Sequence, residues 1–173
     1  MFETNGKFNE EIINELKVYA VSPKKKKFYK IFAIVYGLLG LIAIVIGLIA
    51  SNQFLIFMFF LLELLAVGGI GLIPYLQYKF KKNNMEALKE ISDKSYFEIK
   101  TFFNETGAIH QNLTTSTNFE IKYKFFSRLE ETPSMYILFT KSGQSVLVLK
   151  NCFSDEEKKA FKEFIKEKCK NIK

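Results

Sequence analysis

The strongest constraint on this chain is an apolar stretch from residue 31 to residue 76. It divides into two runs, residues 31–50 and 54–76, joined by the polar residues Ser51, Asn52 and Gln53. Each run has about the twenty residues that a helix needs to cross a hydrocarbon core roughly 30 Å thick. The short connection makes the two helices antiparallel neighbours. The sequence therefore predicts a transmembrane helical hairpin that carries a polar domain.

Basic residues border this stretch on both sides. Four lysines precede the first run and three more follow the second, namely Lys24, Lys25, Lys26, Lys27, Lys79, Lys81 and Lys82. Lysines beside a membrane helix mark its cytoplasmic end. We therefore expect a multi-pass protein of the inner (plasma) membrane, with both termini in the cytoplasm and the loop outside. The same lysines are candidates for contact with anionic lipid.

Glu63 is the only charged residue between Ile31 and Tyr78. A carboxyl group at that depth is costly, and it is a candidate for a functional or helix-contact role. Small residues in the first run repeat at helical spacing, and Gly37, Gly40 and Gly47 are expected to pack against the second helix. For Glu63, a contact within the hairpin or an oligomer is favoured over transport.

The remaining sequence suggests three further segments. Residues 1–27 are expected to form a cytoplasmic amphipathic helix followed by the basic flank, because apolar residues recur at helical spacing after Asn9. The hairpin itself is placed at 28–78, with Pro74 near its end. Residues 79–94 are expected to form a juxtamembrane linker helix. Residues 95–173 are expected to form the cytoplasmic domain.

In that last segment the hydrophobic period changes from helical to alternating. Strands are predicted at residues 96–103, 108–113, 117–123, 125–129, 135–140 and 146–149, separated by turn residues. A capping box formed by Ser154 and Glu157 then begins a C-terminal amphipathic helix. The expected fold is thus a small α+β domain, an antiparallel sheet or partly open barrel capped by one helix.

The chain shows no recognisable catalytic motif. His110, the only histidine, falls in a predicted strand and is expected to be an ordinary sheet residue. Cys152 and Cys169 are expected to be reduced thiols. We predict a protein that is not an enzyme, with no catalytic residue, cofactor or metal. The basic charge of +7 lacks an Arg-rich or aromatic-basic cluster, so nucleic acid is not an expected partner.

Several segments of the tail resemble the YcxB-like family of bacterial membrane proteins. They are residues 102–107 (FFNETG), 121–123 (IKY), 128–132 (RLEET), and the hairpin 135–149 with residues 150–153 (KNCF) before the last helix. Leu149 stands where the family often has proline, and Tyr123 where tryptophan is common. The resemblance extends from about residue 31 to the end. It implies a pleckstrin-homology-like domain held at the inner membrane face, and it carries no catalytic residue.

Two hypotheses about function follow. In the first, the hairpin anchors a domain that binds a protein, a peptide or anionic lipid headgroups, with the bilayer and a membrane protein or a second copy as partners. In the second, the chain is a small transporter or channel subunit that uses Glu63. A Glu63→Gln change that alters ion or proton flux would favour the second.

Overall fold

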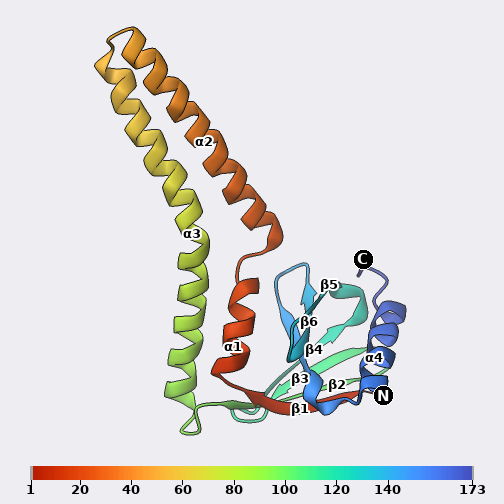
Figure 1. Cartoon of the computed structure of the whole chain (residues 1–173). Helices are drawn as coiled ribbons and strands as arrows, with labels where there is room; N and C mark the ends of the chain where they lie inside the picture. Colours follow the sequence, from red (N-terminus) through yellow and green to blue (C-terminus); the bar gives the residue numbers. More distant parts are fainter. Residues whose placement is uncertain (1, 173) are drawn as a thin grey trace. The chain divides into compact units, whose positions relative to one another are not determined.

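The computed structural model describes residues 2–172, and these fold into two compact units (Figure 1). One unit contains the chain up to Glu15 together with the chain from Met85 onward. The other contains Leu16–Asn84. The first unit is therefore built from two stretches of sequence that the second unit separates.

The second unit is a helical hairpin of α2 (Pro23–Ile49) and most of α3 (Gln53–Ile91). Ser22 caps α2 by accepting a hydrogen bond from the Lys25 backbone, and Pro23 occupies the first turn, where its missing N–H costs nothing. Asn52 caps α3 through its side-chain oxygen, which accepts from the Phe54 N–H at 3.0 Å. Both helices are long and apolar enough to span a membrane.

Helix α3 is longer than the sequence predicts. Residues 54–76 and the linker helix were expected as separate elements divided near Pro74, but α3 continues through Pro74 to Ile91. Proline removes one hydrogen bond from a helix and crowds the preceding turn. The residues that follow it include four lysines, two glutamates and two leucines, which favour helix, so the helix continues beyond the proline.

In the first unit, residues 2–15 and 85–172 form seven antiparallel strands in two sheets. Strands β1 (Glu3–Phe8), β2 (Phe97–Phe103), β3 (Gly107–Asn112) and β4 (Thr117–Lys122) form one sheet in that order. Strands β5 (Phe126–Glu131), β6 (Met135–Thr140) and β7 (Ser145–Leu149) form the other. The predicted sheet arrangement is confirmed, and the two sheets are not joined into a closed barrel.

Strand β1 was not expected from the sequence. It pairs with β2 over six residues, from Glu3 opposite Phe102 to Phe8 opposite Phe97. Its segment ETNGKF is mostly polar and lacks the alternation of a half-buried strand, so the strand is identified only by its pairing with β2. The expected N-terminal helix is present but short, as α1 (Glu10–Leu16) and the 3-10 turn η1 (Lys17–Tyr19).

Helix α4 (Asp155–Lys168) begins at the predicted capping box, with Ser154 and Glu157 bonded reciprocally. Its apolar face supplies Phe161, which is fully buried in the main core. The Phe161 ring lies 5.2 Å from that of Phe103 and 5.3 Å from those of Phe2 and Tyr136. The core thus joins Phe2, which precedes β1, to both sheets and to α4.

Candidate functional site

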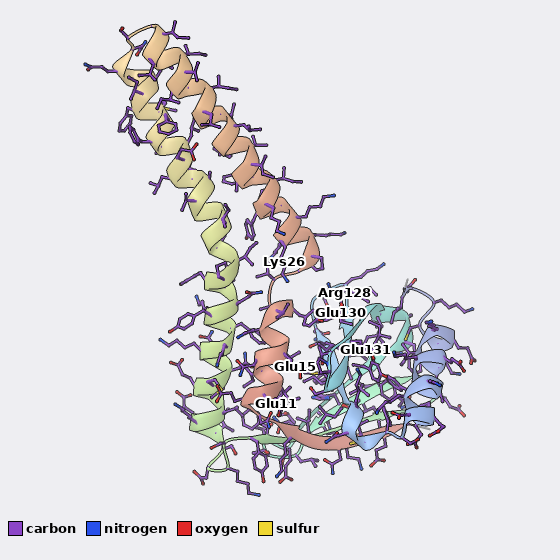
Figure 2. All side chains as sticks on the ribbon, in the orientation of Figure 1. Glu11, Glu15, Lys26, Arg128, Glu130 and Glu131 are labelled. Carbon is purple, nitrogen blue, oxygen red and sulfur yellow. The ribbon has the colours of Figure 1, made fainter. Side chains whose placement is uncertain are left out.

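The basic flanks lie at different places on the two helices. Lys24, Lys25 and Lys27 are exposed in the first turns of α2, whereas the half-buried Lys26 donates from Nζ to the Val18 carbonyl at 2.6 Å (Figure 2). Lys79, Lys81 and Lys82 lie inside the continuous helix α3. At about 1.5 Å per residue, the 39 residues of α3 extend well beyond a hydrocarbon core.

Glu63 points at the partner helix of the hairpin. A Cβ atom placed on Gly40 would lie 2.7 Å from Glu63 Oε1, so the carboxylate occupies the space that this glycine leaves. Among residues 2–172 no hydrogen bond or ion pair is formed by the Glu63 side chain. The structure thus brings together two of the residues selected from the sequence, Glu63 and Gly40.

The other two glycines differ in their surroundings. A Cβ on Gly47 would meet the Ile56 backbone nitrogen at 3.0 Å and Leu55 Cβ at 3.1 Å, so glycine at this position favours close approach of the two helices. A Cβ on Gly37 would meet nothing within 4 Å. Gly40 and Gly47 therefore face α3, whereas Gly37 faces open space. Gly69 of α3, 3.2 Å from the Phe32 ring by the same measure, is a further close contact.

His110 belongs to a buried hydrogen-bonded chain between the two sheets. Thr101 Oγ1 donates to the Leu147 carbonyl at 2.7 Å and lies 2.7 Å from His110 Nδ1. A hydroxyl has one hydrogen, so His110 Nδ1 carries the proton and donates to Thr101. Burial lowers the pKa of His110 from 6.5 to about 4. This neutral, engaged ring is suited to holding β2 and β3 against β7.

The two thiols are in contrasting environments. Burial raises the pKa of Cys169 to about 12, which makes it a poor nucleophile. Cys152 is exposed, and its Sγ lies 2.9 Å from the Asn5 carbonyl and 3.4 Å from the Asn5 backbone nitrogen. This contact covers the middle of the outer edge of β1.

Glu131, at the end of β5 (Figure 2), accepts from two lysines. Lys150 Nζ lies 2.8 Å from Oε1 and Lys162 Nζ lies 2.6 Å from Oε2. The hydrogen bonds from Lys150 and Lys162 lower the pKa of Glu131. Both ammonium groups also lie over the Tyr136 ring, at 4.8 and 5.5 Å. The sequence did not single out this cluster, which ties α4 to the second sheet.

One hollow in this unit, of about 730 Å³, lies beside β1. Lys150 and Lys158 line it, together with Ser134, whose Oγ is buried without a partner among the described residues. Two of the three lysines on its walls are paired with acids, Lys150 with Glu131 and Lys158 with Asp155, each at 2.8 Å, and the third, Lys7, shares the wall with Glu11. The charge of this hollow is thus largely neutralised by its own surroundings.

The second hollow has the same volume, about 730 Å³, and lies beside β4. Its walls include Lys124 and Phe125 on one side and Lys141 on the other. Phe125 is 54% exposed, and its ring lies 5.1 Å from Lys124 Nζ. Exposed aromatic and basic groups around a hollow can contact an apolar or acidic partner. Sequence reasoning missed this site because its walls come from separate turns.

Together these features define a class of protein: a helical hairpin suited to a membrane, attached to a domain of two open sheets and one helix. Comparison with known families gives a match within the domain. Residues 109–165, from β3 into α4, match the family described as YcxB-like protein. The match is narrower than the resemblance drawn from the sequence, because it excludes the hairpin and the segment 102–107 at the end of β2. No curated protein and no solved structure matches the chain.

Proposed function

We propose that this protein is a membrane-anchored binding protein without catalytic activity, whose hairpin holds a pleckstrin-homology-like domain at the cytoplasmic face. One observation carries the proposal. Strands β1 and β2 are hydrogen-bonded neighbours, yet the hairpin separates them in sequence. Because both ends of the hairpin lead into one folded unit, they must lie on the same side of any membrane that it crosses.

The surface of the hairpin supports the membrane location. Large apolar side chains such as Ile34, Leu48 and Phe60 are more than 60% exposed on α2 and α3. A soluble protein rarely exposes such an extensive apolar surface, and lipid would cover it. The lysines at the start of α2 and within α3 favour the cytoplasm as the side on which both ends lie.

Binding rather than catalysis is supported by the state of the reactive groups. His110 is held in a structural hydrogen bond, and the buried Cys169 has a raised pKa. Among the described residues, no cluster of three His, Cys, Asp or Glu side chains could hold a metal. The hollows of the domain and its open sheet edges offer surfaces for a protein, a peptide or lipid headgroups.

The topology is tested with reporters that are active on only one side of the membrane. A reporter after Lys173 is expected to be active in the cytoplasm, and one inserted between Ser51 and Gln53 only outside. A reporter after Lys173 that is active only outside would contradict the proposal.

Crosslinking in native membranes then tests binding, and we expect an adduct on the domain that includes a membrane protein or anionic lipid. A domain that yields no adduct would argue against a binding role.

The second candidate function, a small transporter or channel subunit, rests on Glu63. Its carboxylate lies between the two helices without a hydrogen-bond partner among the described residues. The test is proton or cation flux in vesicles that contain the wild type or Glu63→Gln. Flux that disappears in the variant while the hairpin stays folded would support transport. Equal flux in the two would favour a purely structural contact with Gly40.

A further inference from the structure

We propose that the outer edge of β4 binds an extended acidic peptide of a partner protein as an added strand. This inference rests on the proposed function, in which the domain recruits a partner, and it names the surface and the chemistry. The surface is the second hollow, here called the β4 groove. It is lined by Glu120, Ile121, Lys124 and Phe125 on one side and by Lys141 and Gln144 on the other.

The backbone of β4 offers unpaired hydrogen-bonding groups along this groove. Strand β4 is the last strand of its sheet, with only β3 as a neighbour. Gly107 lies opposite Lys122, but the Gly107 carbonyl already accepts from the Asn104 N–H at 3.0 Å, on the β2 side. In an antiparallel ladder bonded pairs alternate, so the backbone groups of Lys122 face away from β3. The Lys122 carbonyl begins the 3-10 turn Tyr123–Phe125 and accepts its first hydrogen bond, so the open group at this residue is the N–H.

The next pair confirms this alternation. Tyr123 donates its N–H to the Thr106 carbonyl at 3.4 Å, which makes Thr106 and Tyr123 a bonded pair. Counting back by two from Lys122, the backbone groups of Glu120 and Asn118 also face outward. These residues are exposed, as are all residues of β4 except Ile121. An extended peptide can therefore add to this edge through main-chain hydrogen bonds.

Charge indicates which peptide would fit. Lys122, Lys124 and Lys141 are exposed around the edge, and none has an ion-pair partner among residues 2–172. Glu120 is the only acid on the walls, and its Oε1 already accepts from the Thr106 hydroxyl at 3.0 Å. Carboxylates on the peptide would meet these lysines. The exposed Phe125 ring offers a surface for an apolar side chain of the same peptide.

The hollow beside β1 is a weaker candidate for the same ligand. Cys152 contacts the outward N–H and C=O of Asn5 there, and two of the three lysines of that hollow, Lys150 and Lys158, have acidic partners. A lipid headgroup is the other anionic partner that could meet the lysines of the β4 groove. A headgroup would not pair with the outward backbone groups of β4 as a strand does, whereas an extended peptide would. These backbone groups therefore favour a peptide.

The probe for the experiment is a fluorescent peptide of four Glu-Val repeats, and binding is measured by anisotropy with the full chain in zwitterionic nanodiscs. The key variant is Lys122→Pro. Lys122 has φ −67°, close to the angle that proline requires, so this variant fits the backbone and removes only the outward N–H and the charge. The matched control, Lys122→Gln, removes the charge and keeps the N–H.

We expect the wild type to bind the peptide and Lys122→Gln to bind it no more than about fivefold more weakly, as for loss of one exposed charge. Lys122→Pro is expected to bind at least about tenfold more weakly, since it loses a hydrogen bond and obstructs the added strand. A Lys-Val peptide of equal length should not bind. Hydrogen exchange on β3 checks that the proline variant is folded.

A second arm uses the wild type alone and decides the question if the proline variant is misfolded. N-methylation of the valine amides or of the glutamate amides removes N–H groups from one edge of the peptide at a time. One of these two peptides should lose binding. Equal binding by both, equal binding by Lys122→Pro and Lys122→Gln, or no binding by the wild type would overturn the inference.

Lipid is distinguished by nanodiscs that contain phosphatidylglycerol. If binding to the peptide is lost there and both Lys122 variants restore it equally, the lysines contact lipid and the inference fails. The proposed function is judged separately by the reporters and the crosslinks. Peptide binding with an external domain would refute only the cytoplasmic placement, whereas a domain that binds partners elsewhere would refute only the β4 groove.

Discussion

At the scale of single residues, His110 makes the domain sensitive to acid. Its pKa is lowered from 6.5 to about 4 by burial. Between these values the unfolded chain binds a proton that the folded domain does not. The free energy of unfolding is therefore fully retained above about pH 6.5 and falls by about 3 kcal/mol as the pH drops to about 4.

This loss can be measured by hydrogen exchange of the β2 and β3 amides at several pH values, with the full chain in detergent. His110→Gln keeps a side-chain N–H for Thr101 but has no group that titrates in this range. In this variant the exchange rate of the β2 and β3 amides, corrected for the intrinsic rate, should vary less between pH 6.5 and 4 than it does in the wild type. A wild type and a variant with the same pH dependence would show that His110 does not control acid stability.

Two glycines of the first membrane helix make a second residue-scale test. Gly47→Val would press a side chain against the Ile56 backbone, whereas Gly37→Val would extend into open space. We expect the first change to destabilise the hairpin by about 1–3 kcal/mol and the second to have little effect. Unfolding in mixed detergent micelles, followed by circular dichroism, gives the comparison. Equal losses would mean that close approach at Gly47 is unimportant.

At the scale of elements, the dependence of the domain on β1 is the least expected feature. Phe2 packs on the rings of Phe153, Phe161 and Phe164 at 5.2–5.9 Å, although the hairpin separates it from them in sequence. Phe2→Ala should destabilise the domain by about 2–3 kcal/mol. The milder control is Phe8→Ala, because the Phe8 ring stacks on that of Phe97 at the longer distance of 6.3 Å.

The readout is the rate at which a protease cuts the domain after β2 in detergent-solubilised protein. Phe2→Ala should be cut faster than the wild type and faster than Phe8→Ala. Protection equal to that of the wild type would show that the N-terminal strand is dispensable for the domain.

The elements differ in how far the sequence reveals them. Strands β2 to β7 and helix α4 could be predicted because alternation, turn residues and the Ser154 capping box act locally. The hairpin could be predicted just as directly, from the length of its two apolar runs. Strand β1 could not be predicted, since Glu3–Phe8 has a polar sequence and becomes a strand only through its pairing with β2. The end of α3 was misplaced because a proline weakens a helix without always ending it.

The candidate sites follow the same division. Glu63 could be selected from the sequence because one charge in an apolar run is conspicuous, and the structure adds its contact with Gly40. The β4 groove could not, because it needs the position of Lys141 relative to Lys124 and Phe125. The Glu131 cluster likewise joins a strand end, a turn and a helix that are far apart in sequence.

At the scale of the whole molecule, a hairpin suited to a membrane interrupts one folded domain. This arrangement ties the two ends of the hairpin to neighbouring strands. It also means that a chain without its N-terminal residues would lack a strand of the domain. The N-terminal segment therefore acts as part of the domain, and the hairpin is an insertion between β1 and β2.

The most direct measurement is a disulfide across this insertion in native membranes. Asn5 lies opposite Lys100, and its backbone groups face away from β2, so the pair is of the closer, non-hydrogen-bonded kind that suits a crosslink. Asn5→Cys and Lys100→Cys are introduced with Cys152→Ser and a protease site between Ser51 and Gln53. Asn5→Cys with Glu105→Cys is the control pair. After oxidation and cleavage, the two fragments of the first pair should remain joined until reduced, and those of the control should separate. Fragments of the first pair that separate without reduction would contradict the account.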